Sequence, residues 1–190
     1  MAADVWSRIE ASLLRLYSLP HNVVELRNRR PPETPATATA KIVSDIRSGL
    51  NGVPIEETFT GPKLFLRVVG HANRAYSGQW WFDATIFDGL DRTYSRIYFQ
   101  AAERKAVIRD MLREVLAVSR EWNEISEVYA LELPPGASIV GYTGFGTPQQ
   151  VFAKVPLTAK GNRMLVGRAK QIFFPVKNPL WVRSFERLAT

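Results

Sequence analysis

Residues 64–70 read Leu-Phe-Leu-Arg-Val-Val-Gly, an apolar run with a single arginine inside it. A short apolar run rich in β-branched residues is typical of a β-strand. Two interpretations of Arg67 stay open. Either its side chain faces a cleft and binds a ligand there, or it is a surface residue near the end of the strand.

A second block, residues 77–82, reads Ser-Gly-Gln-Trp-Trp-Phe and predicts a turn at Gly78 that leads into a strand. Neighbouring residues on a strand point to opposite sides, so we expect only one of Trp80 and Trp81 to face a cleft. The alternative is that both tryptophans simply pack in the core and at the sheet edge.

A third block, residues 167–175, reads Gly-Arg-Ala-Lys-Gln-Ile-Phe-Phe-Pro. It predicts a loop followed by a strand, with Gln171 where the strand begins. Taken alone, Gln171 is also compatible with an ordinary amide on an edge strand.

Hydrophobic periodicity predicts the remaining elements. The expected helices and strands, in residue numbers, are helices 4–18, 39–48 and 100–122, and strands 64–69, 80–86, 128–133, 138–142, 150–155 and 171–176. Residues 31–39, rich in Pro, Thr and Ala, predict an extended linker. This order predicts an α+β fold, with a helical extension and linker over residues 1–58 and a catalytic domain over residues 59–190.

Composition limits the chemistry. The chain has 190 residues, of which 46% are hydrophobic and 11% aromatic, enough to build a core. It has no cysteine, which excludes disulfides, thiolate nucleophiles and zinc sites that need cysteine. The sequence has only two histidines, His21 and His71, which argues against a histidine-rich metal site. No apolar stretch approaches the roughly 18 residues of a membrane span, and we expect no signal peptide and no membrane partner.

The net charge of +7 favours anionic partners such as nucleic acid or an acidic protein surface, although a merely basic surface is an equal alternative. Basic residues gather in the C-terminal third. Residues 160–187 contain one acidic residue, Glu186, and the basic residues Lys160, Arg163, Arg168, Lys170, Lys177, Arg183 and Arg187.

The three blocks, in their order, resemble the ADP-ribosyltransferase fold of bacterial toxins and effectors. In that family a first strand carries an arginine, a second carries aromatic or small residues near nicotinamide, and a late strand carries an acidic residue or glutamine. The third block, together with the Pro-Pro-Gly at residues 134–136 and the loop at residues 146–149, resembles the tuberculosis necrotizing toxin type and the C-terminal toxins of polymorphic effectors.

The resemblance implies a split antiparallel β core with flanking helices, and NAD as the substrate. It implies Arg67 and Gln171 as catalytic residues. It implies NAD-binding residues in all three blocks, namely Arg67, Val68, Gly70, Trp80, Trp81 and Gln171. No metal is implied. The implied product is ADP-ribose attached to a macromolecular acceptor, either protein or RNA.

Two features differ from the family pattern. The usual transferase glutamate is replaced by Gln171, which can orient a ribose hydroxyl but cannot remove a proton. The Gly-Gly-Gly of the necrotizing toxin type is Gly-Arg-Ala at residues 167–169.

Two other functions stay open. One is an NAD glycohydrolase that uses water, and the other is a nucleic-acid-binding module without catalysis. If the chain is a toxin of this type, we expect action in the cytoplasm of a target cell and a cognate immunity protein as partner.

Overall fold

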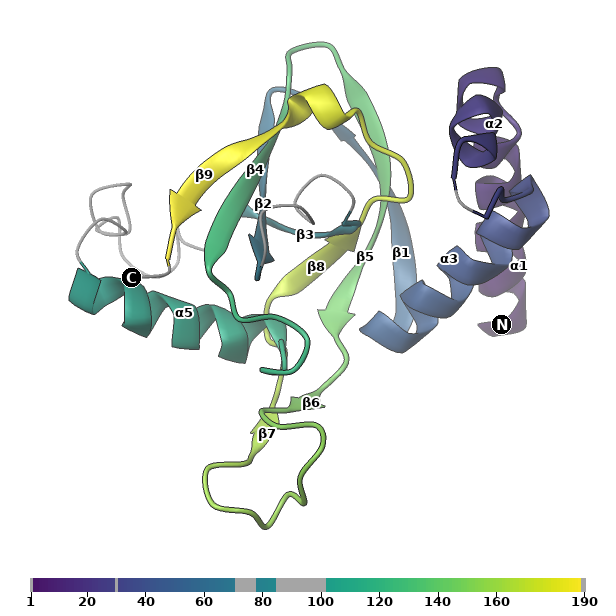
Figure 1. Cartoon of the computed structure of the whole chain (residues 1–190). Helices are drawn as coiled ribbons and strands as arrows, with labels where there is room; N and C mark the ends of the chain where they lie inside the picture. The colour runs from purple at the N-terminus through teal and green to yellow at the C-terminus, as the bar shows by residue number, and fades with distance from the viewer. Residues whose placement is uncertain (1, 30, 71–77, 85–101, 189–190) are drawn as a thin grey trace.

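The computed structural model describes residues 2–29, 31–70, 78–84 and 102–188. Mixed helices and strands make an α+β fold (Figure 1). In chain order the elements are α1 (Ala2–Tyr17), α2 (Pro20–Arg27), α3 (Pro35–Gly49), β1 (Leu50–Thr60), β2 (Lys63–Val69), β3 (Trp80–Asp83), α5 (Ala102–Leu116), β4 (Glu127–Leu133), β5 (Ser138–Gly146), β6 (Gln149–Gln150), β7 (Met164–Leu165), β8 (Lys170–Phe173), the 3-10 turn η3 (Pro179–Trp181) and β9 (Val182–Arg187).

Within the described part of the chain, a seven-stranded sheet forms in the order β1-β5-β8-β3-β2-β4-β9, and every neighbouring pair is antiparallel. The sheet curls on itself (Figure 1). Phe59 of edge strand β1 and Val182 of edge strand β9 accordingly belong to the same buried cluster. At its centre Phe59, Phe65 and Phe174 pack edge to face, with ring centroids 5.0 to 5.7 Å apart.

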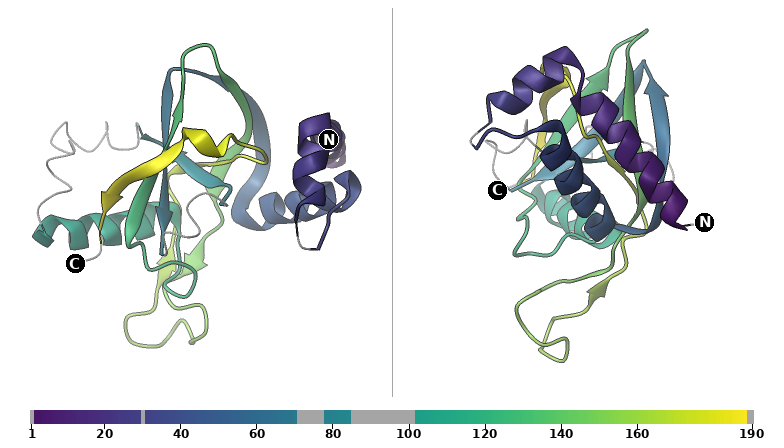
Figure 2. Two further views of the ribbon diagram at one scale, coloured as in Figure 1. Left: turned by 45° about the horizontal axis from the view of Figure 1, so that its top comes forward. Right: turned by 90° about the vertical axis from the view of Figure 1, so that its right-hand side faces the viewer.

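Helices cover the outer face of the curled sheet in two places. Ile108, Leu112 and Leu116 of α5 pack against apolar residues of β2, β3 and β4. Helices α1 and α3 pack against β5 and β8 on the other side (Figure 2). The outer face therefore has two separate cores.

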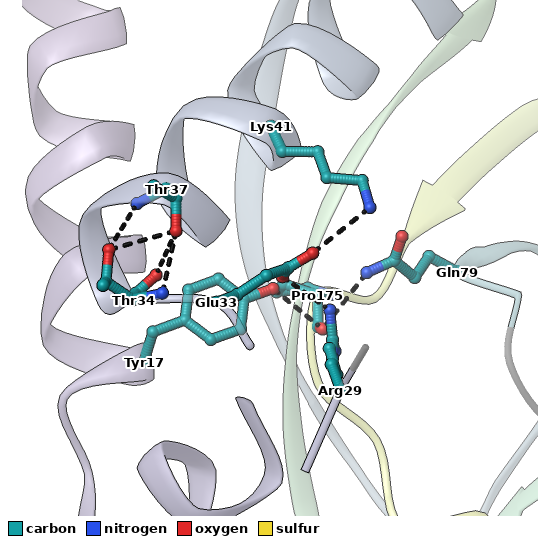
Figure 3. Close-up of polar contacts among 8 residues, drawn as sticks. All are labelled: Tyr17, Arg29, Glu33, Thr34, Thr37, Lys41, Gln79 and Pro175. Carbon is teal, nitrogen blue, oxygen red and sulfur yellow. Dashed lines mark hydrogen bonds and ion pairs between the residues drawn. The ribbon is translucent and has the colours of Figure 1, made fainter. Parts of the chain in front are cut away.

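The N-terminal helices belong to the same folded body as the sheet. Leu13 and Ile46 share one buried cluster with Tyr142 and Phe173. The Tyr17 hydroxyl donates a 3.2 Å hydrogen bond to the carbonyl oxygen of Pro175, just after β8 (Figure 3). The boundary expected between residues 58 and 59 falls inside β1, which runs from Leu50 to Thr60.

Two features of the helical segment differ from the prediction. The segment expected as an extended linker contains the start of α3, because Thr34 caps that helix. Its hydroxyl accepts from the Thr37 amide, and the Thr37 hydroxyl accepts from the Thr34 amide (Figure 3). Pro20, expected only to end the first helix, occupies the first turn of α2, where proline is tolerated.

Helix α5 ends at Leu116 rather than continuing to Trp122, because Ala117 adopts a positive φ of 51°. Arg113 stabilises the chain beyond this end. Its buried guanidinium donates to the carbonyl oxygens of Val118 and Asn123 at 2.8 and 3.0 Å. Trp122, where the expected helix was to end, is 61% exposed.

The expected central strands are confirmed at β2 and β4, and β5 runs four residues further than expected, to Gly146. The strand expected at residues 150–155 is wrong, since only the short β6 forms there. Residues 85 and 86, at the end of one expected strand, and residues 100 and 101, at the start of the expected long helix, lie outside the described residues.

Leu13→Ala should lower the free energy of unfolding of the whole chain by about 2–5 kcal/mol, because Leu13 is fully buried between the N-terminal helices and the sheet. The neighbouring Leu14 is 44% exposed, so Leu14→Ala is the matched control and should change stability by less than about 0.5 kcal/mol. Denaturant unfolding followed by tryptophan fluorescence measures both. Equal midpoints for Leu13→Ala and the parent would contradict a shared core.

Candidate functional site

Strand β3 lies between β2 and β8 but pairs with β8 over a longer stretch than with β2. It pairs with β2 at Phe65–Asp83 and Leu66–Phe82, whereas it pairs with β8 from Trp80 to Phe82. The next two residues, Arg67 of β2 and Trp81 of β3, are not paired, so the two strands separate there. The separation opens the sheet beside the ends of α3 and α5.

A cavity of about 460 Å³ lies at this separation, within the roughly 300–1,000 Å³ range of small-molecule sites. Its walls come from α3, β2, β3, β8, the end of β5, β6 and the segment after α5. They are lined by Asp45, Ser48, Gly49, Arg67, Val68, Trp80, Trp81, Phe82, Leu116, Ala117, Val118, Trp122, Asn123, Gly146, Thr147, Gln149 and Gln171.

Most of the residues predicted from the sequence line this cavity. Arg67, Val68, Trp80, Trp81 and Gln171 are among its lining residues. Gly70 is not. It follows β2, and its carbonyl oxygen accepts a 2.7 Å hydrogen bond from the hydroxyl of Ser126.

The strand register places Arg67 and Gln171 on opposite faces of the sheet. Gln171 is opposite Phe82, which is opposite Leu66, so these three side chains leave the sheet on the outer face. Arg67 alternates with Leu66 and is opposite Tyr129, which belongs to the inner core. The two side chains line one cavity because β2 and β3 separate between them.

The guanidinium of Arg67 lies directly over Gly78, where a Cβ atom would overlap it. The Nη1 atom is buried and has no hydrogen-bond partner. Burial lowers the pKa of Arg67 to about 10, so the side chain still carries its charge at neutral pH. A buried guanidinium with an unpaired N–H is a favourable position for an anionic ligand.

A second cation adds to the positive potential near Arg67. The pKa of Lys177 is lowered to about 8, first by burial and then by the positive charge of Arg67. Lys177 lies outside the residues that line the cavity. Its effect on the site is therefore electrostatic.

The paired tryptophans lie on opposite faces, as alternation requires. Trp80 is half-buried, stacks edge to face on Phe173 at 4.9 Å between centroids, and covers Gly49, where a Cβ atom would overlap the indole ring. Trp81 is fully buried in the inner core, and its Nε1 has no hydrogen-bond partner. Of these two tryptophans, Trp80 is therefore the one whose ring can stack on a ligand.

Gln171 has a structural contact that the sequence did not indicate. Its Nε2 donates a 2.7 Å hydrogen bond to the carbonyl oxygen of Leu116, the last residue of α5. The amide nitrogen also fills the space where Gly146 lacks a Cβ. Gln171 thus connects β8 to the end of α5, and its carbonyl oxygen is the atom it can offer to a ligand.

Sequence reasoning missed the wall of the cavity that α3 provides, because residues 1–58 were expected to form a separate extension. Asp45 of α3 and Arg67 of β2 are the ionisable side chains among the lining residues. Burial raises the pKa of Asp45, while the positive charge of Lys41 opposes that shift. The sequence offered no signal for Asp45, because its place at the cavity depends on how α3 packs on Trp80.

Among the described residues, no three His, Asp or Glu side chains are grouped so that they could hold a metal ion. None of the described helices has the length and apolarity that a membrane crossing requires.

Gln171→Glu should destabilise the protein more than Gln171→Ala. The alanine variant leaves the Leu116 carbonyl unpaired, at a cost of about 1–3 kcal/mol, whereas the carboxylate adds repulsion against that oxygen. A protonated carboxyl at position 171 can donate a hydrogen bond to the Leu116 carbonyl, so the fold favours the protonated form and raises the pKa of that carboxyl. The destabilisation caused by Gln171→Glu should therefore shrink as the pH falls through this raised pKa.

Urea unfolding of both variants at neutral and acidic pH measures this order. A Gln171→Glu variant as stable as the parent at neutral pH would show that the hydrogen bond to Leu116 does not hold the helix end.

Comparison with known proteins gives little further information. No protein family and no curated protein matches the sequence. Among solved structures, the chain is similar to one described as Rhs1-CT in complex with cognate immunity protein RhsI1. The identity is 11%, the alignment covers 73% of this chain and 81% of that chain, and the TM-score is 0.40. A likeness this weak supports no inference about function.

Proposed function

We propose that this chain cleaves NAD at the nicotinamide–ribose bond and transfers the ADP-ribose to a macromolecule, as ADP-ribosyltransferase toxins do. The observation that carries the proposal is the buried Nη1 atom of Arg67, which has no hydrogen-bond partner among the described residues, in a cavity that Trp80 and Gln171 also line. These residues come from the three sequence blocks that resemble that family.

The reaction needs three things from the protein. The bond between C1′ of the ribose and the nicotinamide nitrogen breaks, and its electron pair stays on the nitrogen, which becomes neutral. The ribose carbon becomes an oxocarbenium cation. An acceptor oxygen or nitrogen then bonds to C1′ and loses its proton. The site must therefore hold the diphosphate, orient the nicotinamide and ribose, and accept a proton.

The lining residues suit these tasks. Arg67 presents a planar fork of donors that matches phosphate oxygens, and Lys177 adds positive potential nearby. The half-buried ring of Trp80 can stack on nicotinamide, which contributes about 1 kcal/mol beyond the buried area. The carbonyl oxygen of Gln171 can accept a hydrogen bond from a ribose hydroxyl.

A macromolecular acceptor is favoured over water by the surface near the cavity. The segment between β6 and β7 projects from the body of the protein (Figure 1). It carries the exposed basic side chains of Lys154, Lys160 and Arg163 next to the exposed apolar side chains of Val155 and Leu157. RNA or an acidic protein surface fits this composition. Hydrolysis by water remains the second candidate, since it needs no acceptor surface.

A purely nucleic-acid-binding module is less well supported. Such modules expose aromatic rings on which bases stack. Among the described residues, most large aromatic side chains are in the cores, with Trp81, Phe65, Phe82, Phe173 and Phe174 fully buried, and Trp122 and Phe145 are exposed. A steep loss of nucleic-acid binding with rising salt, without any NAD cleavage, would favour this function instead.

An enzyme that consumes NAD endangers the cell that makes it. We therefore propose that the chain acts in a target cell as a toxin, and that a cognate immunity protein blocks the cavity in the producing cell.

The purified parent should release nicotinamide from NAD, and Arg67→Ala should lower kcat/KM by roughly 10²–10³-fold while the protein stays folded. Arg67→Lys should recover little, because an ammonium lacks the bidentate fork. Gly78→Ala should lose about 10²-fold, because the new methyl displaces the flexible guanidinium without altering the strand. Chromatography of nicotinamide, with and without RNA or protein acceptors, measures turnover and separates transfer from hydrolysis.

Arg183→Ala is the matched control, because Arg183 is an exposed strand arginine, paired with Glu132, that does not line the cavity. It should retain parental turnover. Absence of nicotinamide release from the folded parent would overturn the proposed function, and full activity of Arg67→Lys would overturn the anchoring role of the guanidinium.

A further inference from the structure

The C-terminal turn of α3 brings a carboxylate into the cavity. Asp45 and Gly49 are four residues apart on α3 and therefore share one face of the helix. Trp80 packs directly on Gly49. Asp45, Gly49, Trp80 and Arg67 all line the same cavity, so the carboxylate faces the volume beside the ring that we assign to nicotinamide.

Asp45 is placed where folding gains little from a negative charge. It is half-buried in the last turns of α3, near the negative end of the helix dipole. Other aspartates of the described chain form ion pairs: Asp4 with Arg8 at 3.6 Å, Asp83 with Lys63 at 3.3 Å and Asp110 with Arg120 at 3.8 Å.

Asp45 is the exception among the aspartates that the structure describes, because its carboxylate forms no ion pair. Two ionisable groups interact electrostatically with it, Lys41 on its own helix and Tyr17 on α1, and Arg67 lines the same cavity. The negative charge of Asp45 contributes to raising the pKa of Tyr17 above its usual range, after burial and neighbouring acids. A half-buried acid without a cationic partner suggests a functional role.

We propose that Asp45 is the general base of the site, an inference that rests on the proposed NAD cleavage. The carboxylate of Asp45 stabilises the oxocarbenium cation as the electron pair of the broken bond moves to the nicotinamide nitrogen. It then accepts the proton that the acceptor hydroxyl, amine or water loses as its oxygen or nitrogen bonds to C1′. The proton passes from Asp45 to solvent, which restores the carboxylate.

Gln171 cannot perform this step. An amide does not accept a proton at neutral pH, and one of the two N–H donors of Gln171 already bonds to the Leu116 carbonyl. Among the described residues that line the cavity, Asp45 is the acidic one. Gln171, at the late-strand position, therefore orients the ribose, and the carboxylate comes from Asp45 on α3, in the N-terminal part of the chain.

The test compares turnover, KM and stability of Asp45→Asn with those of the parent. General base catalysis contributes about 10²–10⁴-fold, so kcat for nicotinamide release should fall by at least about 100-fold, with KM for NAD unchanged. The variant should melt at the same or a higher temperature, because it removes an unfavourable charge. Asp110→Asn is the matched control, a helical aspartate outside the cavity, and should keep parental kcat.

Chemical rescue separates a catalytic role from a structural one. Added formate should restore part of the turnover of Asp45→Ala, and should not affect Asp110→Asn. Two negative outcomes are distinguishable. If the parent releases no nicotinamide, the proposed function fails and the inference with it. If the parent is active and Asp45→Asn matches its kcat, or formate restores nothing to a folded Asp45→Ala, Asp45 is not the base although NAD cleavage stands.

Discussion

The pairing of β3 determines where this protein can bind a ligand. Because β3 pairs with β8 from Trp80 to Phe82 but pairs with β2 only at Phe82 and Asp83, the sheet opens beside Trp80 and Trp81. Side chains from the inner and the outer face meet there. Arg67 reaches the gap from the inner face and Trp80 from the outer face, and the two helix ends of α3 and α5 complete the walls.

The polar groups at this opening are costly in a folded protein. A buried donor without a partner costs about 1–3 kcal/mol, and Arg67 Nη1 and Trp81 Nε1 are both of this kind. Two cations, Arg67 and Lys177, also repel each other across a poorly solvated region. A chain selected only for stability would replace these groups with apolar ones. Arg67 and Trp81 both line the one cavity, and Lys177 adds positive potential from outside it, which an anionic ligand would explain.

Sequence patterns predicted the elements whose burial is regular. The apolar runs of β2 and β4 and the stripe of α5 follow the periods of strand and helix. Strands β1 and β9 were missed because each is an edge strand, and along β1 only Leu50, Pro54 and Phe59 are buried. The role of Arg113 at the end of α5 was missed because a charge within a helix normally faces solvent. Arg67, Trp80 and Gln171 could be proposed from their order along the chain, whereas Asp45 could not, because its place depends on how α3 packs on Trp80.

The N-terminal helices are part of the site because Gly49, as a glycine, has no Cβ atom. Gly49 ends α3 and leads into β1 without a Cβ, and the indole of Trp80 occupies the vacant space. The contact fixes the end of α3 against the same strand that borders the opening in the sheet. Asp45, one turn earlier, is thereby held at the cavity by backbone packing rather than by an ion pair. A carboxylate positioned in this way remains unpaired, which is the condition under which it can stabilise a developing cation and accept a proton.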